Sequence, residues 1–256
     1  MLPRYLFRYQ SLATETQRQR FAKALSACEL YFSSPLSFND PFENRFHILP
    51  DGTEDSCLRL LSDPDNRRLA GLPPTGPVPP EAVKAFLAFM HGQGVVSDRY
   101  REQTFGDLPV CCLSASPIIP LMWSHYADGH RGICLCFDTT RDPELFSHAY
   151  EVQYSKTFPE LGFFTMGPAE YAQAVVLTKA QWWGYEQEWR ILLVDQPLGP
   201  HPYRPEALDS VILGCAAPQD QEAFVRASLA KSAPGIRVDR ATIADGEYGL
   251  AVNRVS

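Results

Sequence analysis

The sequence predicts an α+β fold: a single domain over residues 1–256, with a central mixed, largely antiparallel sheet, flanking helices and a helical insertion. Two observations carry this prediction. Short apolar runs rich in β-branched residues recur along the second half, as is typical of buried strands. Segments in which apolar residues follow a helical spacing lie between these runs. A chain of 256 residues can build one large core or two small ones.

The chain opens with a short aromatic strand at Tyr5–Tyr9, and a helix is expected from Thr14 to Cys28. Thr14 can cap this helix, because Gln17 stands at the position that completes a capping box. A second strand is expected at Leu30–Phe32. It runs into a polar loop interrupted by prolines.

Residues from about 51 to 101 are predicted to form the helical insertion, since this segment is too short for a core of its own. Helices are expected over 54–72 and from Glu81 to about His91. The prolines of the stretch Leu72–Pro80 exclude both a helix and a central strand there.

The second half alternates further strands and helices. Strands are expected at 110–113, 133–137, after Glu188, at 211–213 and near 238–243, and helices near 121–128, 168–182 and 219–231. The apolar run Ile191–Val194 predicts that the strand after Glu188 is central in the sheet.

Composition excludes several classes of protein. The formal net charge of -7 argues against general attraction to nucleic acid. No apolar run approaches the ~20 residues that cross a bilayer, so no membrane partner is expected. The seven cysteines include Cys111, Cys112, Cys134 and Cys136 in apolar runs, where reduced core residues are typical. None has the spacing of a zinc site, so we expect a cytoplasmic protein without a metal.

The densest group of charged and aromatic residues is the stretch Trp182–Arg190. Glu186 and Glu188 are two residues apart, so in an extended chain they share a face and raise each other's proton affinity. This arrangement suits acid/base or cation-stabilising chemistry. Alternatively, Arg190 neutralises both in a structural ion-pair cluster.

Two other polar segments attract attention. In Met122–Gly132, Trp123 and Tyr126 share one helical face, and the spacing of the two histidines is poor for a metal pair. In the segment Asn39–Glu43, Asn39 and Asp40 either close a turn through their own backbone or face a ligand.

Four motifs resemble a bacterial family, domain-of-unknown-function family 2971. They are Tyr5–Tyr9, Phe38–Glu43, Leu121–Asp128 with Gly132, and Tyr185-Glu186-x-Glu188-x-Arg190. The resemblance spans about the whole chain. The name of this family implies no activity.

A second resemblance is to ADP-ribosyltransferases. These enzymes carry an arginine or histidine on the first strand, a serine-containing strand end before a helix, and E-x-E or Q-x-E at the start of a later strand. Arg8, Ser114 with Ser116, and Glu186 with Glu188 follow that order. The resemblance implies that Arg8 clamps the pyrophosphate of NAD, that the serines hold its ribose or amide, and that Glu188 stabilises an oxocarbenium-like centre. Tyr9, Trp123 and Tyr126 would complete the NAD site, with Trp123 or Tyr126 stacked on nicotinamide.

Three functions remain open. The first is an NAD-consuming ADP-ribosyltransferase, such as a toxin or phage-defence effector, acting on an unknown protein or nucleic-acid acceptor. The second is a metal-dependent hydrolase or nuclease, with ligands drawn from the set Asp40, Glu43, His125, Glu186 and Glu188. The third is a non-catalytic ligand-binding domain. One shared cleft is expected for the set Tyr9, Asn39, Asp40, Trp123, Tyr126 and Glu188.

Overall fold

The computed structural model describes residues 1–49, 51–69, 71–92, 102, 105–162, 164–166 and 168–254. The chain divides into two compact units. Unit 1 comprises Met1–Ser37, Asp107–Tyr154 and Gln181–Ser256, and unit 2 comprises Phe38–Gly106 and Ser155–Ala180. Each unit is built from segments that are distant in the sequence.

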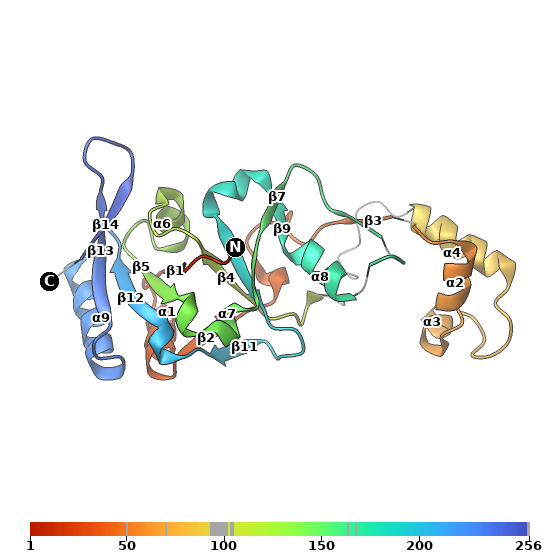
Figure 1. Ribbon diagram of the computed structural model, residues 1–256, viewed down its shortest axis with the longest axis horizontal. Helices are drawn as coiled ribbons and strands as arrows, with labels where there is room; N and C mark the ends of the chain where they lie inside the picture. The colour runs from red at the N-terminus through yellow and green to blue at the C-terminus, as the bar shows by residue number, and fades with distance from the viewer. Residues whose placement is uncertain are drawn as a thin grey trace. The chain divides into compact units, whose positions relative to one another are not determined.

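Unit 1 contains an eight-stranded sheet, which confirms the predicted α+β class (Figure 1). Its strands lie in the order β14 (Leu250–Arg254), β13 (Arg237–Ile243), β12 (Leu208–Leu213), β5 (Ile133–Asp138), β1 (Tyr5–Gln10), β4 (Val110–Ser114), β10 (Glu188–Leu192) and β6 (Ala149–Glu151). Strands β12 and β13 pair in parallel, and the other pairs are antiparallel. The sheet is therefore mixed and largely antiparallel, as predicted.

The position of β10 corrects one expectation. This strand is fully buried but lies next to the edge strand β6, whereas β5 and β1 occupy the middle of the sheet. All residues of β10 are buried although it is not central, so an apolar run indicates burial without indicating a central place.

Helices cover the two faces of the sheet unequally (Figure 1). On one face, the core includes residues from α1 (Glu15–Ser26), α7 (Pro143–Phe146) and α9 (Gln219–Ser232), such as Phe21, Phe146 and Val225. On the other face, Met122 and Trp123 of α6 (Pro120–Tyr126) pack against Phe7 and Tyr9. Adjacent residues of β1 thus belong to different cores, as strand alternation requires.

The start of α1 is fixed by the capping box that the sequence predicted. The Thr14 hydroxyl accepts from the Gln17 backbone N–H at 3.3 Å, and the Gln17 side chain accepts from the Thr14 N–H at 3.0 Å. Such a cap stabilises a helix by about 1 kcal/mol.

The remaining elements of unit 1 are short. They are β2 (Glu29–Phe32), which pairs antiparallel with β11 (Gly199–Pro202), and 3₁₀ turns at Pro35–Ser37, Thr139–Arg141, Gln181–Glu186 and Pro205–Ala207. β7 (Gln153–Ser155) and β9 (Thr178–Ala180) lie where the chain passes between the two units. The helix expected over 168–182 ends at Val176, and β9 and the 3₁₀ turn at Gln181–Glu186 follow it before β10.

Unit 2 contains α2 (Glu54–Leu60), α3 (Pro64–Leu69), α4 (Pro80–Gly92) and α8 (Pro168–Val176), with β3 (His47–Leu49) and β8 (Glu160–Gly162) paired in parallel. The described part of the predicted insertion contains α2, α3 and α4, and two short helices stand where one was expected over 54–72. Residues 93–101 lie outside the described residues. Within unit 2, a small separate core is formed by Cys57, Leu61 and Val83. Among the described residues, none of the helices combines the length and apolar character that a bilayer crossing requires.

Candidate functional site

The three strands that carry Arg8, Ser114 and Glu188 are consecutive neighbours in the sheet of unit 1. Ser114 of β4 lies opposite both Phe7 of β1 and Glu188 of β10. Residues paired across antiparallel strands point to the same face, so Ser114 and Glu188 share the α6 face with Phe7. Arg8 follows Phe7 and points to the opposite face, where Nη1 contacts Cys111 Sγ.

This placement separates residues that the transferase resemblance would bring together. The pairing register sets the faces: one residue of shift would have turned Arg8 toward Ser114. As the strands pair here, Arg8 lies across the sheet from Glu188.

Glu188 forms a buried bidentate ion pair with Arg190. Arg190 Nε donates to Glu188 Oε1 at 2.7 Å, and Nη2 donates to Oε2 at 3.0 Å. Glu188 is 4% exposed and Arg190 is fully buried. The sequence left open that Arg190 neutralises both Glu186 and Glu188 in a structural ion-pair cluster. The contacts described here show this for Glu188, whose two carboxylate oxygens both accept from Arg190.

Glu186 is directed elsewhere because Gln187 has a left-handed backbone, with φ of 47°. The hydroxyl of Tyr126 donates to Glu186 Oε1 at 2.8 Å, and the Ser114 hydroxyl donates to the Glu186 carbonyl at 2.6 Å. Ser114 is fully buried. Its hydroxyl therefore serves to anchor the turn before β10.

Trp123 is also a core residue, which corrects its predicted role in stacking on nicotinamide. Its ring is fully buried, its indole N–H donates to the Pro117 carbonyl at 2.8 Å, and Tyr9 packs against it edge-on with ring centroids 5.2 Å apart. The Tyr9 hydroxyl donates to the Ser116 carbonyl at 2.8 Å. Burial raises the pKa of Tyr9, so this hydroxyl remains a neutral donor.

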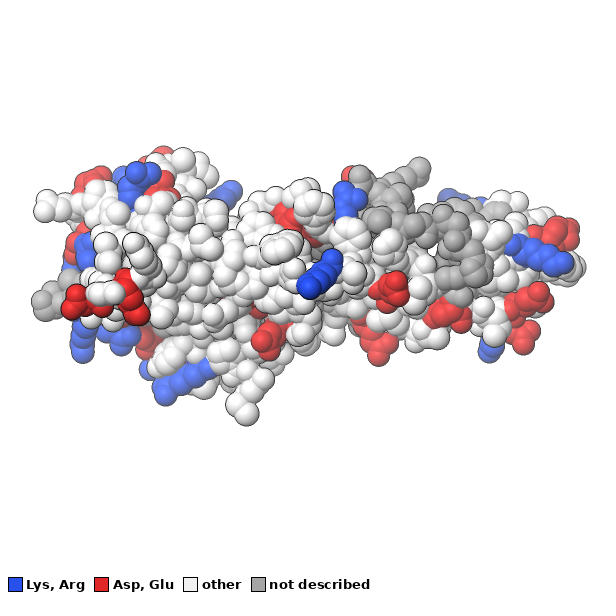
Figure 2. Space-filling model, turned by 90° about the horizontal axis from the view of Figure 1, so that it is seen from above, with Lys and Arg blue, Asp and Glu red and all other residues white. Residues whose placement is uncertain are grey.

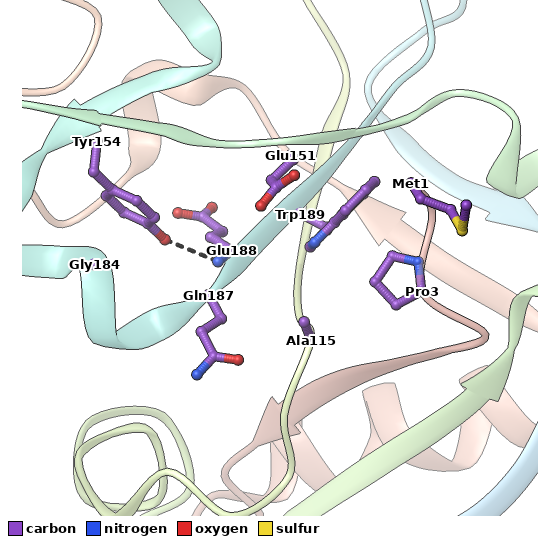
Figure 3. Close-up of a pocket in the computed structure, with 9 residues that line it drawn as sticks. All are labelled: Met1, Pro3, Ala115, Glu151, Tyr154, Gly184, Gln187, Glu188 and Trp189. Atoms are coloured by element: carbon purple, nitrogen blue, oxygen red, sulfur yellow. Dashed lines mark hydrogen bonds between the residues drawn. The ribbon is translucent and has the colours of Figure 1, made fainter.

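A pocket of about 420 Å³ lies at the start of β10 (Figure 3). Figure 3 shows Tyr154 reaching the backbone of Glu188, whose N–H donates to the Tyr154 hydroxyl at 2.8 Å. The complete lining is Met1, Pro3, Ala115, Glu151, Tyr154, Gly184, Gln187, Glu188 and Trp189. The sequence prediction missed Tyr154, which lies 34 positions before its partner.

A larger pocket, of about 560 Å³, lies beside β1 and α1. We call it the basic pocket, because Arg8, Arg20 and Lys23 line it together with a single carboxylate, Glu29. Its other lining residues are Tyr9, Gln10, Ser11, Gln17, Ala24, Leu30, Tyr31, His125, Tyr126, Leu135 and Pro200. Its volume lies within the range of roughly 300–1,000 Å³ that is usual for small-molecule sites.

The local structure explains why this pocket exists. β1 pairs with β5 through six residue pairs, but its pairing with β4 is limited to Phe7 and Ser114. The strands separate beyond that point, where Arg8 and Tyr9 follow. Gln17, Arg20 and Lys23 succeed one another at intervals of three on α1, so one helical face supplies a wall of the pocket.

Tyr31 holds both arginines of the basic pocket in place. Arg8 Nη2 donates to the Tyr31 carbonyl at 3.3 Å, and the Arg20 guanidinium lies 5.6 Å from the centre of the Tyr31 ring. Burial raises the pKa of the Cys111 thiol, so Arg8 contacts a neutral sulfur. Both arginines are thus positioned by neutral groups.

The charges of the basic pocket differ from those elsewhere in unit 1. Arg4, Arg131 and Arg237 each pair with an aspartate. Within the described part of the chain, Arg8, Arg20, Lys23 and Glu29 form no ion pair. On the face of the molecule shown in Figure 2, acidic and basic side chains are interspersed. Three unpaired cations around one pocket are consistent with a site for an anion.

Asn39 and Asp40 belong to unit 2. Asn39 is exposed, whereas Asp40 is buried and its Oδ1 accepts from the Phe42 N–H at 2.9 Å. Asp40 therefore closes a turn through its own backbone. Glu43 forms a buried ion pair with Lys179, with Oε1 and Nζ 3.1 Å apart.

Of the residues predicted to share one cleft, Tyr9 and Tyr126 line the basic pocket, Glu188 lines the smaller pocket and Trp123 lines neither. The sequence prediction missed Arg20, Lys23, Glu29 and Tyr31. Their spacing in the sequence could have indicated them. Arg20 and Lys23 are three residues apart on a helix, and Glu29 and Tyr31 are two apart on a strand, so the members of each pair share a face. Across the described ranges, no three histidine, cysteine, aspartate or glutamate side chains are grouped so that they could hold a metal ion.

In a comparison with protein families, residues 122–191 match the model of DUF2971, which is described as a protein of unknown function. The matched segment includes most of α6, the turn with Glu186 and most of β10. Neither the curated proteins nor the solved structures give a match.

Proposed function

We propose that unit 1 binds a small nucleotide whose phosphates lie against Arg8, Arg20 and Lys23 in the basic pocket. The single observation that carries this proposal is the gathering of three cations without ion-pair partners, within the described residues, around one pocket of ligand size. Arginine matches the geometry of phosphate oxygens through several N–H donors, and lysine adds a point charge.

The aromatic lining supports a nucleotide in preference to a simple anion. Tyr9, Tyr31, His125 and Tyr126 offer ring surfaces and polar atoms in the same pocket. A nucleotide carries an apolar base and an anionic end, and such ligands gain affinity from stacking as well as from charge. NAD and ADP are the members of this class that we would test first.

Calorimetric titration of the protein with ADP and with NAD tests the proposal. Removing one positive charge costs about 1.5–3 kcal/mol of binding, since that is the usual value of a hydrogen bond to a charged group. Arg20→Gln should therefore bind ADP roughly 10-fold more weakly or worse. Arg254→Gln, which removes an exposed arginine outside the pocket, is the matched control. Equal affinity of the two variants, or no binding by the wild type, would contradict the proposal.

A second candidate is ADP-ribosyl transfer from NAD, in which the bond to nicotinamide breaks and an acceptor nucleophile takes the ADP-ribosyl group. Tyr126 supports it, because this residue lines the basic pocket and donates to the buried carboxylate of Glu186. A negative charge near the pocket could stabilise an oxocarbenium-like centre.

Release of nicotinamide from NAD, with and without cell lysate as a source of acceptors, tests this candidate. Glu186→Gln should lower the rate roughly 100-fold or more, as is usual when one preorganised electrostatic group is lost. Binding of NAD without any release of nicotinamide would leave the binding function and exclude transfer.

A further inference from the structure

We infer that Glu29 makes the basic pocket selective for a nucleotide whose ribose keeps both hydroxyl groups, against one that carries a 2′-phosphate. This inference rests on the proposed nucleotide-binding function. It assigns the single carboxylate of the pocket a role that the three cations cannot perform.

The place of Glu29 in the fold is well defined. It is the first residue of β2, it pairs with Pro202 of β11, and it is partly buried. Residues two apart on a strand share a face, so Glu29 lies on the same face as Tyr31, whose carbonyl and ring hold Arg8 and Arg20. The carboxylate and the two arginines are therefore organised by one short strand.

The second observation concerns the ion pairing of Glu29 in the pocket. Glu29 lines the pocket with three cations, yet within the described residues it forms an ion pair with none of them. Its carboxylate oxygens remain available as acceptors. A carboxylate that merely balanced the positive charge of the pocket would be expected to pair directly with Arg8, Arg20 or Lys23.

The chemistry of the carboxylate then selects the ligand. An ionised carboxylate only accepts hydrogen bonds, and the 2′- and 3′-hydroxyls of ribose are two adjacent donors. A 2′-phosphate would replace one donor by an anion next to Glu29, and the repulsion of like charges is strong in a partly buried site. The phosphates of the ligand would lie against Arg8, Arg20 and Lys23, and its ribose against Glu29.

Calorimetric titration of the wild type with NAD and with NADP tests the inference. We expect NAD to bind at least about 10-fold more tightly, the ratio that corresponds to one hydrogen bond to a charged group. Glu29→Gln, which keeps the shape and loses the charge, should bring the ratio close to one. Glu206→Gln, an exposed carboxylate outside the pocket, should leave it unchanged.

A ligand series on the wild type gives an independent reading that needs no variant. 2′-Deoxy-ADP should bind more weakly than ADP by roughly 10-fold, because it lacks one donor to Glu29. Equal binding of NAD and NADP by the wild type, tighter binding of NADP, or an unchanged ratio in Glu29→Gln would overturn the inference while the pocket still binds nucleotides. Failure of all four ligands to bind would overturn the proposed function itself.

Discussion

Arg8 and Arg190 lie on strands separated only by β4, yet they differ in burial and in ion pairing. Arg190 is fully buried, and both oxygens of Glu188 accept from it. Arg8 is partly exposed and lines a pocket. Within the described residues, its hydrogen-bond partners are the Cys111 thiol and the Tyr31 carbonyl. The first arginine has its charge satisfied inside the protein, and the second keeps its charge available to a ligand.

The difference shows that two arginines on neighbouring parts of one sheet can have different roles, one in stability and one in binding. A buried arginine must be paired, because an unpaired charge away from water costs several kcal/mol. An arginine beside a pocket can stay unpaired, because solvent or an anionic ligand satisfies it. We therefore expect substitutions at the two positions to change different measured quantities.

The largest effect is expected when the buried pair is broken. Glu188→Gln should lower the free energy of unfolding by about 3–5 kcal/mol, because the buried bidentate pair with Arg190 would lose its negative charge. The resemblance to ADP-ribosyltransferases instead implies a catalytic role for Glu188, in which the same substitution would lower activity and leave the fold intact. Urea unfolding measures the effect, with Glu151→Gln, an exposed carboxylate at the same pocket, as control. A loss no larger than that of the control would contradict the structural role.

Arg8→Gln should act on binding. We expect ADP affinity to fall by about 1.5–3 kcal/mol, the usual contribution of a hydrogen bond to a charged group. The free energy of unfolding should change little, since Arg8 has no carboxylate partner within the described residues. Titration and urea unfolding of the same preparation separate the two quantities. Loss of stability with unchanged affinity would reverse the comparison between Arg8 and Arg190.

Tyr126→Phe tests the link between the basic pocket and Glu186. The substitution removes the hydroxyl that donates to the buried carboxylate at 2.8 Å. When a buried acceptor such as the Glu186 carboxylate loses a hydrogen-bond donor, the cost is about 1–3 kcal/mol. The free energy of unfolding should therefore fall by that amount. Tyr248→Phe, at a fully exposed tyrosine, is the control. Equal stability of the two variants would exclude an energetically significant contact.

The smallest effect concerns a paired charge near the surface. The hydrogen bond from Arg226, with support from Arg240, holds the pKa of Glu222 below its ordinary value of 4.5. A lowered pKa in the folded state means that this stabilisation is present above pH 4.5 and is lost as the pH falls through the lowered pKa. Its size should be at most about 1 kcal/mol, as for other solvent-accessible pairs.

The melting temperatures of the wild type and of Glu222→Gln, measured across this pH range, check that sign. The wild type should melt higher at neutral pH, and the difference should shrink in acid. If the difference in melting temperature grows as the pH falls, the pairing of Glu222 with Arg226 and Arg240 does not stabilise the fold in the way expected.

Local signals predicted much of the fold. Thr14 and Gln17 were sufficient to place the start of α1, because a capping box depends only on neighbouring residues. The apolar runs at β4, β5 and β12 were likewise sufficient to predict strands there. Strand order was not predictable in this way, so β10 was expected at the centre and lies next to the edge.

The candidate site was harder to predict because it depends on long-range pairing. The faces of Arg8 and Ser114 follow from a register that joins residues 107 positions apart, Phe7 and Ser114. Glu29 and Arg8 meet in one pocket only because β1 separates from β4 beyond that pair. No spacing within the sequence specifies either event.

A structure of the protein crystallised with ADP tests the central claim most directly. We predict that the phosphates lie within hydrogen-bonding distance of Arg8 and beside Arg20 and Lys23, while Glu188 stays paired with Arg190. ADP bound at another place, or phosphates in contact with Arg190 after the pair has opened, would contradict it.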